Sequence, residues 1–473
     1  MGCNGLNGDS DKKSLNLYKL LATQTHMSSA KQPTYLRGAP KSRLSRYNGW
    51  LPARPEVYRE FVHRHRQIGK DRRRAAAEHA PVIQKFSDTI RADPEMSALI
   101  DEVFIQAAKP PGLETLDNFE ELLYAMDALV YAPPKYVLAK DESGNVIGEP
   151  VGVPMFFLFD LLSNTAAGYN LFHRPAFNVI LKEVFDEWGC YLTTTDSNKS
   201  LNETDEGWFG PAALASLEEG RGDFNSTWIC PDPTAPNRGF QSWDAFFTRQ
   251  PQENARPVQA ADDKSLIHNA CESTTFNISY NVKKNDQFWL KTQAYSLHNM
   301  LNKDDNYADK FVGGTVYQAF LSPQDYHRWH APVDGTIIDT VLVPGTYYGV
   351  LFDAGAEEGD PDLKPGDPHG AIIRSQAYLT TTAARALIYI QADNPDIGLM
   401  CFIGIGMGEV STCEVTVKKG DRVKTGNEIG MFHFGGSSHA MIFGPQAKLT
   451  FADVVQVDQH HLVNSILAQA TEA

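Results

Sequence analysis

Two histidines three residues apart form the first group in this sequence that could do chemistry. His327 and His330 belong to the run Tyr-His-Arg-Trp-His-Ala-Pro-Val-Asp-Gly. Imidazole titrates near neutral pH, and on a helical turn these two rings would share a face and divide two proton-transfer steps. A zinc site would need a third ligand, and the sequence offers none nearby. The pair therefore predicts acid–base chemistry without a metal.

A second group follows a strand-like segment near the C-terminus, where Gly435-Gly436 precedes Ser437-Ser438. Glycine leaves the following peptide bond without steric cover. The hydroxyl of Ser437 could then attack the carbonyl carbon of Gly436, provided that a neutral histidine accepts its proton. By composition alone, the same four residues are more typical of an ordinary loop than of a reactive site.

The elements before residue 235 read as helices. Pro55 begins an amphipathic run with an acidic first turn, and apolar residues recur at helical spacing over 119–130 and 177–188. Gly189 is positioned to cap the last of these helices. We therefore predict an α-helical domain over residues 51–234.

After residue 235 the sequence changes to short β-rich segments separated by turns. Expected strands cover residues 274–282, 335–343, 371–379, 386–392, 399–405, 413–417 and 429–434. The glycines of Gly404–Gly408 indicate close strand packing, because no phosphate-binding helix follows them. The predicted fold class is α+β, with a mainly β second domain over 235–473 that forms a sandwich or a partly closed barrel.

Charge is divided unevenly along the 473 residues. The net charge is −15, yet residues 1–91 hold 18 basic and 7 acidic side chains, so the remainder is strongly acidic. An acidic body argues against a nucleic-acid partner. Residues 1–50 read as a flexible basic tail, which is either a solvated extension or a contact for anionic lipid or another subunit.

Cysteine usage and hydropathy bear on the compartment. The six cysteines are scattered without a metal-binding spacing, and neither a signal peptide nor an apolar run of membrane-spanning length is found. These features predict a cytoplasmic protein with reduced thiols and no integral membrane association.

Four ordered motifs over about residues 235–445 resemble the phosphatidylserine decarboxylase family. The family's entry motif "FFxR…RP" is matched by Phe246–Arg249 with Arg256-Pro257. Its histidine box "YHR-x-H-x-P-x-x-G" is matched by Tyr326–Gly335. Its C-terminal glycine motif is matched by Gly420–Phe432, and its "LGST"-type cleavage site by Gly435–Ser438. Together with the helical first domain, they are most similar to a fungal branch of that family, which includes decarboxylases of free L-tryptophan.

The resemblance implies a self-processing enzyme. Family members cut themselves at a Gly–Ser bond, which here is Gly436–Ser437. Ser437 would become a pyruvoyl group at the start of a small subunit, residues 437–473. That group would form a Schiff base with the substrate amine and withdraw electrons as CO₂ leaves. No added metal or pyridoxal phosphate is implied.

The resemblance also implies roles for three further residues. His330 matches the base of the self-cleavage relay, and His327 matches the histidine used in decarboxylation. Glu272, in Asn-Ala-Cys-Glu-Ser, stands where the family has the relay Asp. Asp262 and Asp263 are the alternatives, because a longer Glu side chain changes the geometry.

The implied reaction is decarboxylation of a free aromatic amino acid, above all L-tryptophan, to its amine. The alternative is decarboxylation of phosphatidylserine, which the basic tail would favour. Trp329, Tyr347, Tyr348 and Phe434 could supply aromatic walls for an indole. A biotinyl- or lipoyl-type carrier lacks its exposed hairpin lysine here, and a serine hydrolase lacks its GxSxG turn.

Overall fold

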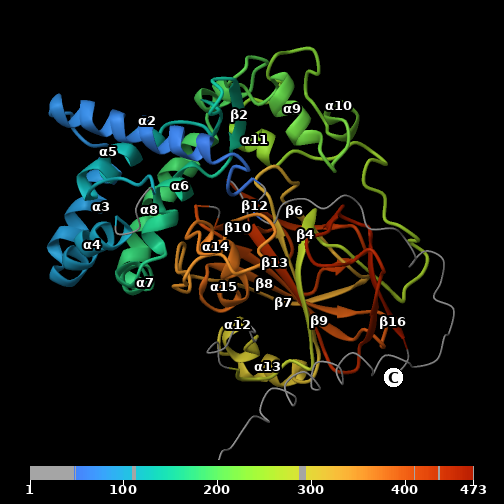
Figure 1. Ribbon diagram of the computed structural model, residues 1–473. Helices are drawn as coiled ribbons and strands as arrows, with labels where there is room; N and C mark the ends of the chain where they lie inside the picture. Colours follow the sequence, from blue (N-terminus) through green and yellow to red (C-terminus); the bar gives the residue numbers. More distant parts are fainter. Residues whose placement is uncertain are drawn as a thin grey trace, which may run out of the picture.

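The computed structural model describes residues 47, 49–108, 113–286, 295–409, 411–434 and 437–471. Figure 1 shows most of the first-half helices on one side of the molecule and the β-sheets on the other. The α+β class predicted from the sequence is confirmed, and the sheets form an open sandwich rather than a closed barrel. The predicted tail lies almost entirely outside the described residues. Trp50 at its end is buried, and its indole N–H donates to the Leu321 carbonyl (3.2 Å).

Seven helices make up the first domain. They are α2 (Pro55–Arg74), α3 (Pro81–Ala92), α4 (Pro94–Ala107), α5 (Phe119–Leu129), α6 (Pro154–Ser163), α7 (Ala166–Phe172) and α8 (Pro175–Leu192). Five of them begin with proline, whose fixed φ suits the first helical position and whose missing N–H costs nothing there. Asp93 and Asn118 cap α4 and α5 by accepting backbone N–H groups.

This domain also contains a β-hairpin that the sequence analysis missed. Strands β1 (Lys135–Lys140) and β2 (Val146–Val151) pair antiparallel across a turn in which the Asp141 carboxylate accepts the N–H groups of Ser143 and Asn145. The turn-forming residues of Asp141–Asn145 were the signal in the sequence that could have indicated this hairpin.

Short helices connect the first domain to the sheets. They are the 3₁₀ helix η2 (Thr195–Ser200) and the α-helices α9 (Pro211–Glu218), α10 (Phe224–Thr227) and α11 (Trp243–Phe247).

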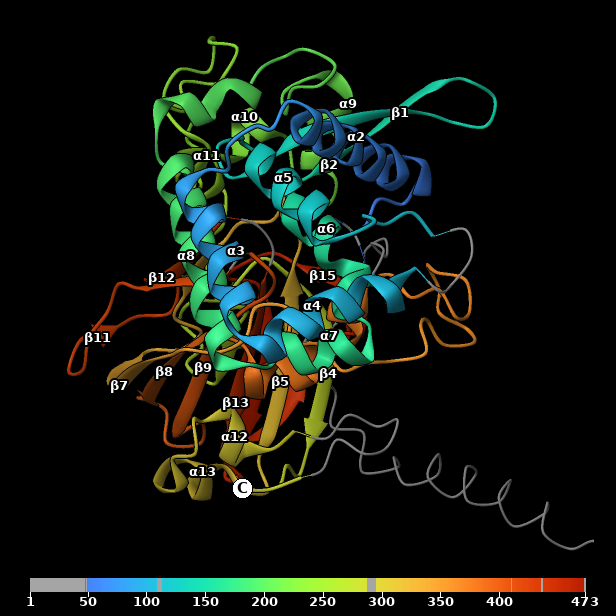
Figure 2. The same cartoon turned by 90° about the vertical axis from the view of Figure 1, so that its left-hand side faces the viewer.

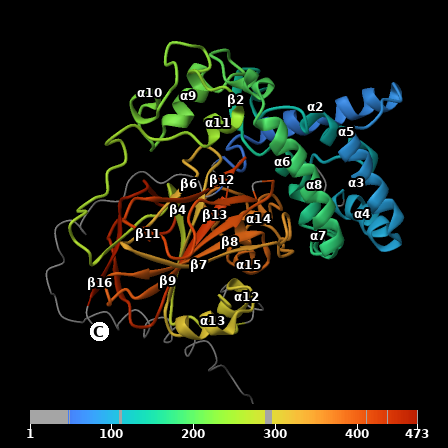
Figure 3. The same ribbon diagram turned by 180° about the vertical axis from the view of Figure 1, so that it is seen from behind.

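An antiparallel eight-stranded sheet dominates the second domain, with strand order β11-β7-β8-β9-β13-β5-β4-β15. The strands are β4 (Ser273–Tyr280), β5 (Thr315–Leu321), β7 (Gly335–Val343), β8 (Arg385–Ala392), β9 (Leu399–Gly406), β11 (Arg422–Val423), β13 (Ser437–Phe443) and β15 (His460–His461). Helices on one side of it, seen from behind in Figure 3, are α12 (Leu297–Met300), α13 (Asp305–Phe311), α14 (Ala371–Arg374) and α15 (Gln376–Thr382).

Two three-stranded sheets complete the domain. One has the order β10-β12-β6 and consists of β10 (Thr412–Val415), β12 (Glu428–His433) and β6 (Arg328–His330). The other has the order β14-β16-β3 and consists of β14 (Lys448–Phe451), β16 (Ile466–Thr471) and β3 (Leu266–His268).

Six of the seven expected strands are present, and the expectation for residues 371–379 is wrong. That segment forms α14 and α15. Its buried side chains recur at helical spacing, at Ile372, Ile373, Gln376 and Ala377. A short apolar run cannot be assigned to a strand or a helix by periodicity alone. Gly370 (φ +74°) begins the turn into α14, and its N–H donates to the buried Asp160 carboxylate of α6 (2.9 Å).

The glycines over 404–408 pack strands closely, as expected. Trp329 of β6 lies between the two sheets, where a Cβ on Gly404 would come within 2.7 Å of its ring and one on Gly430 within 2.5 Å. Trp329 is fully buried and also contacts Phe432 edge-on at 4.6 Å. This tryptophan therefore serves as core packing between the sheets.

No helix in the described part of the chain is long and apolar enough to cross a membrane.

We expect Gly404→Ala to lower the free energy of unfolding by about 1–3 kcal/mol, because the added methyl group overpacks against Trp329. Urea denaturation would measure it. Gly69→Ala is the matched control: its Cβ would meet Glu121 at an ordinary 3.4 Å inside α2, where alanine favours the helix. Equal stability of Gly404→Ala and the wild type would contradict the packing argument.

Candidate active site

Ser437 opens the central strand β13. Its backbone is paired with Leu321 of β5 on one side and Gly406 of β9 on the other. The side chain is fully buried, and its hydroxyl has no hydrogen-bond partner among the described residues. Gly436, the other side of the expected cleavage site, lies outside the described residues. A buried hydroxyl without a partner is costly, which marks Ser437 as a candidate reactive group.

The neighbouring Ser438 has the opposite character. Its Oγ donates toward the Ala319 carbonyl (3.0 Å) and the Gln376 side chain (3.2 Å), and it accepts from Gln318 (3.1 Å). Successive side chains in a strand point to opposite faces, so only Ser437 faces the β10-β12-β6 side. The structure thus distinguishes two serines that the sequence presents as equivalent.

His327 is fully buried directly after the turn that follows β5. Its Nδ1–H donates to the Asp325 carbonyl (2.9 Å), and its ring stacks on Phe247 at 4.1 Å. Burial lowers the pKa of His327 to about 3. The ring is therefore neutral at pH 7, with Nε2 free of a partner among the described residues and able to accept a proton.

His330 has different surroundings, because residues 328–330 form strand β6 and not the helical turn expected from the sequence. Its Nδ1–H donates to the Gly426 carbonyl (2.7 Å), and Nε2 accepts from the Tyr326 hydroxyl (2.8 Å). Burial lowers its pKa below the usual value. Both ring nitrogens of His330 thus have a partner, and the two histidines do not share a face.

Glu272 is fully buried beside this histidine. The backbone N–H of His330 donates to the Ala270 carbonyl (2.8 Å), and the carboxylate raises the pKa of His330 slightly against the effect of burial. One carboxylate oxygen pairs with Arg256, and the other has no partner among the described residues.

The alternatives to Glu272 are placed less favourably. Asp262 is exposed, and Asp263 accepts hydrogen bonds from Ser265 in the turn before β3. Burial next to His330 therefore favours Glu272 among the three candidate acids.

Asp325 is a buried residue that the sequence analysis did not single out. It pairs with Arg221 (2.6 Å), accepts from His460 (3.1 Å) and holds the Ser322 N–H (2.7 Å). Burial alone would raise the pKa of Asp325, but the Arg221 guanidinium and the hydrogen bonds from His460 and Ser322 keep it below its usual range. Asp325 fixes the turn that carries His327, and its position two residues before that histidine was the only signal in the sequence.

The two sheets meet at one corner beside Ser437. Strands β9 and β13 are neighbours in the large sheet, while β10 and β12 are neighbours in the small sheet. Residues 407–411 join β9 to β10, and residues 434–436 join β12 to β13. The expected cleavage site therefore lies in one of two adjacent corner connections.

Helix α8 of the first domain packs against this corner. Phe434 adopts φ +75°, which is unusual for a residue with a side chain, and its ring is buried beside Trp188 (6.3 Å between centroids). A Cβ on Gly189 would come within 2.7 Å of the Phe434 ring. The expectation that Gly189 caps α8 is wrong: the helix continues to Leu192, and the glycine makes room for Phe434.

Glu409, in the other corner connection, joins the two domains. Its buried carboxylate accepts the N–H groups of Met155 (2.9 Å) and Phe156 (3.2 Å) at the start of α6, and the Tyr348 hydroxyl. Burial raises the pKa of Glu409 to about 7. Tyr348 therefore anchors a domain contact.

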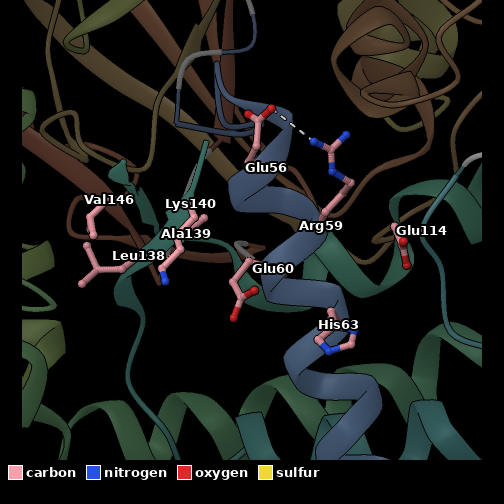
Figure 4. Close-up of a pocket in the computed structure, with 9 residues that line it drawn as sticks. All are labelled: Glu56, Arg59, Glu60, His63, Glu114, Leu138, Ala139, Lys140 and Val146. Atoms are coloured by element: carbon pink, nitrogen blue, oxygen red, sulfur yellow. Dashed lines mark hydrogen bonds and ion pairs between the residues drawn. The ribbon is translucent and has the colours of Figure 1, made fainter. Parts of the chain in front are cut away.

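A hollow of about 540 Å³ lies on the first domain between α2 and the β1–β2 hairpin (Figure 4). Its lining is mostly charged, with Arg59 and Glu56 paired at 3.1 Å, and none of the candidate residues contributes to it. This hollow is therefore not part of the candidate active site.

No hydrogen bond joins Ser437, His327 and Glu272 in the described part of the chain, but each of them has a buried polar atom that lacks a partner. Ser437 Oγ, His327 Nε2 and one oxygen of Glu272 are all buried without partners among the described residues. Within the described ranges no cluster of three or more His, Cys, Asp or Glu side chains could hold a metal ion.

Comparisons with known proteins agree with these motifs. Family profiles for phosphatidylserine decarboxylase match residues 80–217 and 243–469. A protein named decarboxylase iboD, from Amanita muscaria, is 57% identical over 349 residues, which are 74% of this chain and 100% of that protein.

Two further relatives bear names with a substrate. The L-tryptophan decarboxylase of Psilocybe cubensis is 35% identical over 420 residues, 85% of this chain and 89% of its own. Phosphatidylserine decarboxylase proenzyme 2 of Oryza sativa subsp. japonica is 27% identical over 230 residues, 49% of this chain and 32% of its own.

We expect Glu409→Gln to change how stability depends on pH. The raised pKa means that the folded protein keeps this proton up to about pH 7, whereas the unfolded chain releases it near 4.5. The carboxyl group therefore lowers wild-type stability as pH rises from about 4.5 to 7, by about 3 kcal/mol at most.

Urea unfolding of both proteins between pH 4.5 and 8 would measure this effect. The stability of Glu409→Gln relative to the wild type should rise with pH over this interval. Asp160, whose pKa is raised to about 6, titrates in both proteins and cancels in the difference. A stability difference between the two proteins that does not vary with pH would contradict the raised pKa of Glu409.

Proposed function

Because the chain belongs to the phosphatidylserine decarboxylase family, we propose that it is a self-processing, pyruvoyl-dependent decarboxylase of a free aromatic amino acid, with L-tryptophan as the proposed substrate. The observation that carries the proposal is the contrast between Ser437, buried with an unpartnered hydroxyl, and Ser438, whose hydroxyl is fully engaged.

Self-cleavage begins with the Ser437 hydroxyl. Its Oγ attacks the carbonyl carbon of residue 436, the amide C–N bond breaks, and an ester forms. Loss of the Ser437 α-proton then expels the residue-436 carboxylate and leaves a dehydroalanine. Water converts this residue to a pyruvoyl group and releases ammonia, so atoms and electrons balance without an oxidant.

A base must remove the proton of Ser437 Oγ. His330 is proposed for this role, with Glu272 stabilising the imidazolium that forms. Its Nε2 holds the Tyr326 hydroxyl in the uncut chain, so either that hydrogen bond exchanges or Tyr326 relays the proton. Burial supports the role, because it keeps His330 neutral and ready to accept a proton.

Turnover needs an electron sink and a proton donor. The pyruvoyl group supplies the sink by withdrawing electrons from the substrate's α-carbon. His327 Nε2, which carries no proton at pH 7, is proposed first to accept a proton released by the substrate's ammonium group and then to return it to that carbon, while its Nδ1–H is held by the Asp325 carbonyl. The Phe247 ring stacked on His327 fixes the direction in which the proton is delivered.

The share of this chain that each relative matches favours a free amino acid over a phospholipid as the substrate. Those named decarboxylase iboD and L-tryptophan decarboxylase match 74% and 85% of this chain, including the helical domain, whereas the rice phosphatidylserine enzyme matches 49%. The phosphatidylserine alternative is supported by the family profiles themselves and by the basic N-terminal segment. It is retained as an outcome of the substrate test.

Wild-type protein should convert itself into two chains, the smaller of which spans residues 437–473, about 4 kDa by length. Ser437→Ala should remain a single inactive chain, because the attacking oxygen is gone. Denaturing gels and the mass of the small chain would show the cut and its blocked N-terminus. Ser438→Ala is the matched control and should still be cut, whereas cleavage of Ser437→Ala would refute the proposal.

Histidine variants in the same assay separate the two proton roles. His330→Ala should stay uncut, while His327→Ala should be cut and then decarboxylate poorly. Uncut His327→Ala together with cut His330→Ala would reverse the assignment.

We expect the processed enzyme to release CO₂ from L-tryptophan and form tryptamine. A panel of free amino acids and phosphatidylserine vesicles, with CO₂ and amine both measured, would test the substrate class. Deleting residues 1–46 should leave tryptophan turnover nearly unchanged. Turnover of phosphatidylserine vesicles without tryptamine formation, lost on that deletion, would establish the alternative.

A further inference from the structure

A cavity of about 350 Å³ lies between α8 and the corner where the two sheets meet. Helix α8 lies on the side of the first domain that faces the sheets (Figures 1 and 2). The cavity's apolar and aromatic lining includes Phe185 of α8, Val343 and Pro344 after β7, Tyr347, and Cys413 of β10. Phe185 and Tyr347 contact each other edge to face at 5.2 Å. Its volume falls in the range of small-ligand sites.

Three contacts connect this cavity with Ser437. Ser411 lines the cavity and lies against Gly406, because a Cβ on Gly406 would come within 2.6 Å of the Ser411 Cα. Gly406 is in turn the partner of Ser437 on strand β9. Thr412 lines it and pairs with His433, two residues before the 435–436 connection.

The third contact runs through helix α8. Phe185 precedes Gly189 by four residues and so lies on the same face of α8 as the glycine that seats Phe434. The cavity therefore lies near Phe434 and near the N-terminal end of β13.

The charged groups around the cavity are already engaged. Lys182 and Asp186 on α8 pair with each other at 2.6 Å. The Arg385 guanidinium donates to the carbonyls of Asn299, Met300 and Ala383, and Glu409 is held by α6. A phosphate is bound best where cationic N–H groups are not already donating to the protein. The remaining walls suit an uncharged, flat side chain.

We propose that this cavity binds the side chain of the amino acid substrate, so that α8 of the first domain supplies half of the specificity pocket. The inference rests on the proposed function and adds to it the place where an aromatic ring is recognised. The amine and carboxylate of the substrate would point toward residue 437, and the ring would lie between Phe185 and Tyr347.

Two variants test the cavity with little risk to folding. Thr412 is exposed on an edge strand, so Thr412→Trp should fold and place a large ring in the cavity mouth. Phe185→Leu keeps the apolar volume and removes the aromatic face. Each variant should complete self-cleavage yet raise the KM for tryptophan about tenfold or more, with a smaller change in kcat. Indole, which carries the ring alone, should inhibit the wild type competitively and Thr412→Trp much more weakly.

Val179→Trp is the matched control, because Val179 is exposed on the same helix and does not line the cavity. Its KM should equal that of the wild type. A wild-type protein that is uncut or does not decarboxylate would refute the proposed function. If the wild type is cut and decarboxylates tryptophan, but both cavity variants keep its KM and its inhibition by indole, the cavity assignment alone is overturned.

Discussion

Strand β13 is hydrogen-bonded along both edges, to β9 and to β5, and each of its seven residues is buried. The first of these residues is Ser437. Its backbone is therefore paired with a strand on each side, at the point where the chain enters the large sheet. The proposed self-cleavage would break the chain at this boundary, where the reacting hydroxyl is fixed by the sheet. Cleavage there would leave the β13 ladder intact and the small chain bound.

The two domains meet around the same boundary. Gly189 and Trp188 of α8 enclose Phe434, and Glu409 accepts the first N–H groups of α6. Trp50, ahead of the helical domain, donates to the carbonyl of Leu321, which is itself a partner of Ser437. Because two of these contacts come from separate helices of the first domain and the third comes from the segment ahead of it, the first half of the chain packs on this corner at three points.

Burial determines the protonation of the reacting groups. His327 and His330 are both kept neutral by desolvation, although each is surrounded by different hydrogen-bond partners. Charges nearby include the buried Arg249 and three ion pairs, Arg221 with Asp325, Arg256 with Glu272 and Arg328 with Glu428. The site thus combines fixed charges with two neutral bases, an arrangement that suits proton transfer.

Local patterns in the sequence determined the fold class, most strand positions and the candidate segment around Ser437, because turn residues, periodicity and short motifs act over a few residues. Other features depended on contacts between distant residues. The segment 371–379 became helical, Gly189 stayed inside α8 because Phe434 packs on it, and Ser437 differs from Ser438 because a strand sends adjacent side chains to opposite faces. Asp325, Glu409 and the α8 cavity appear only when β5, β9 and the first domain are brought together. Tertiary structure decided these features, since burial and partner choice are properties of the packed chain.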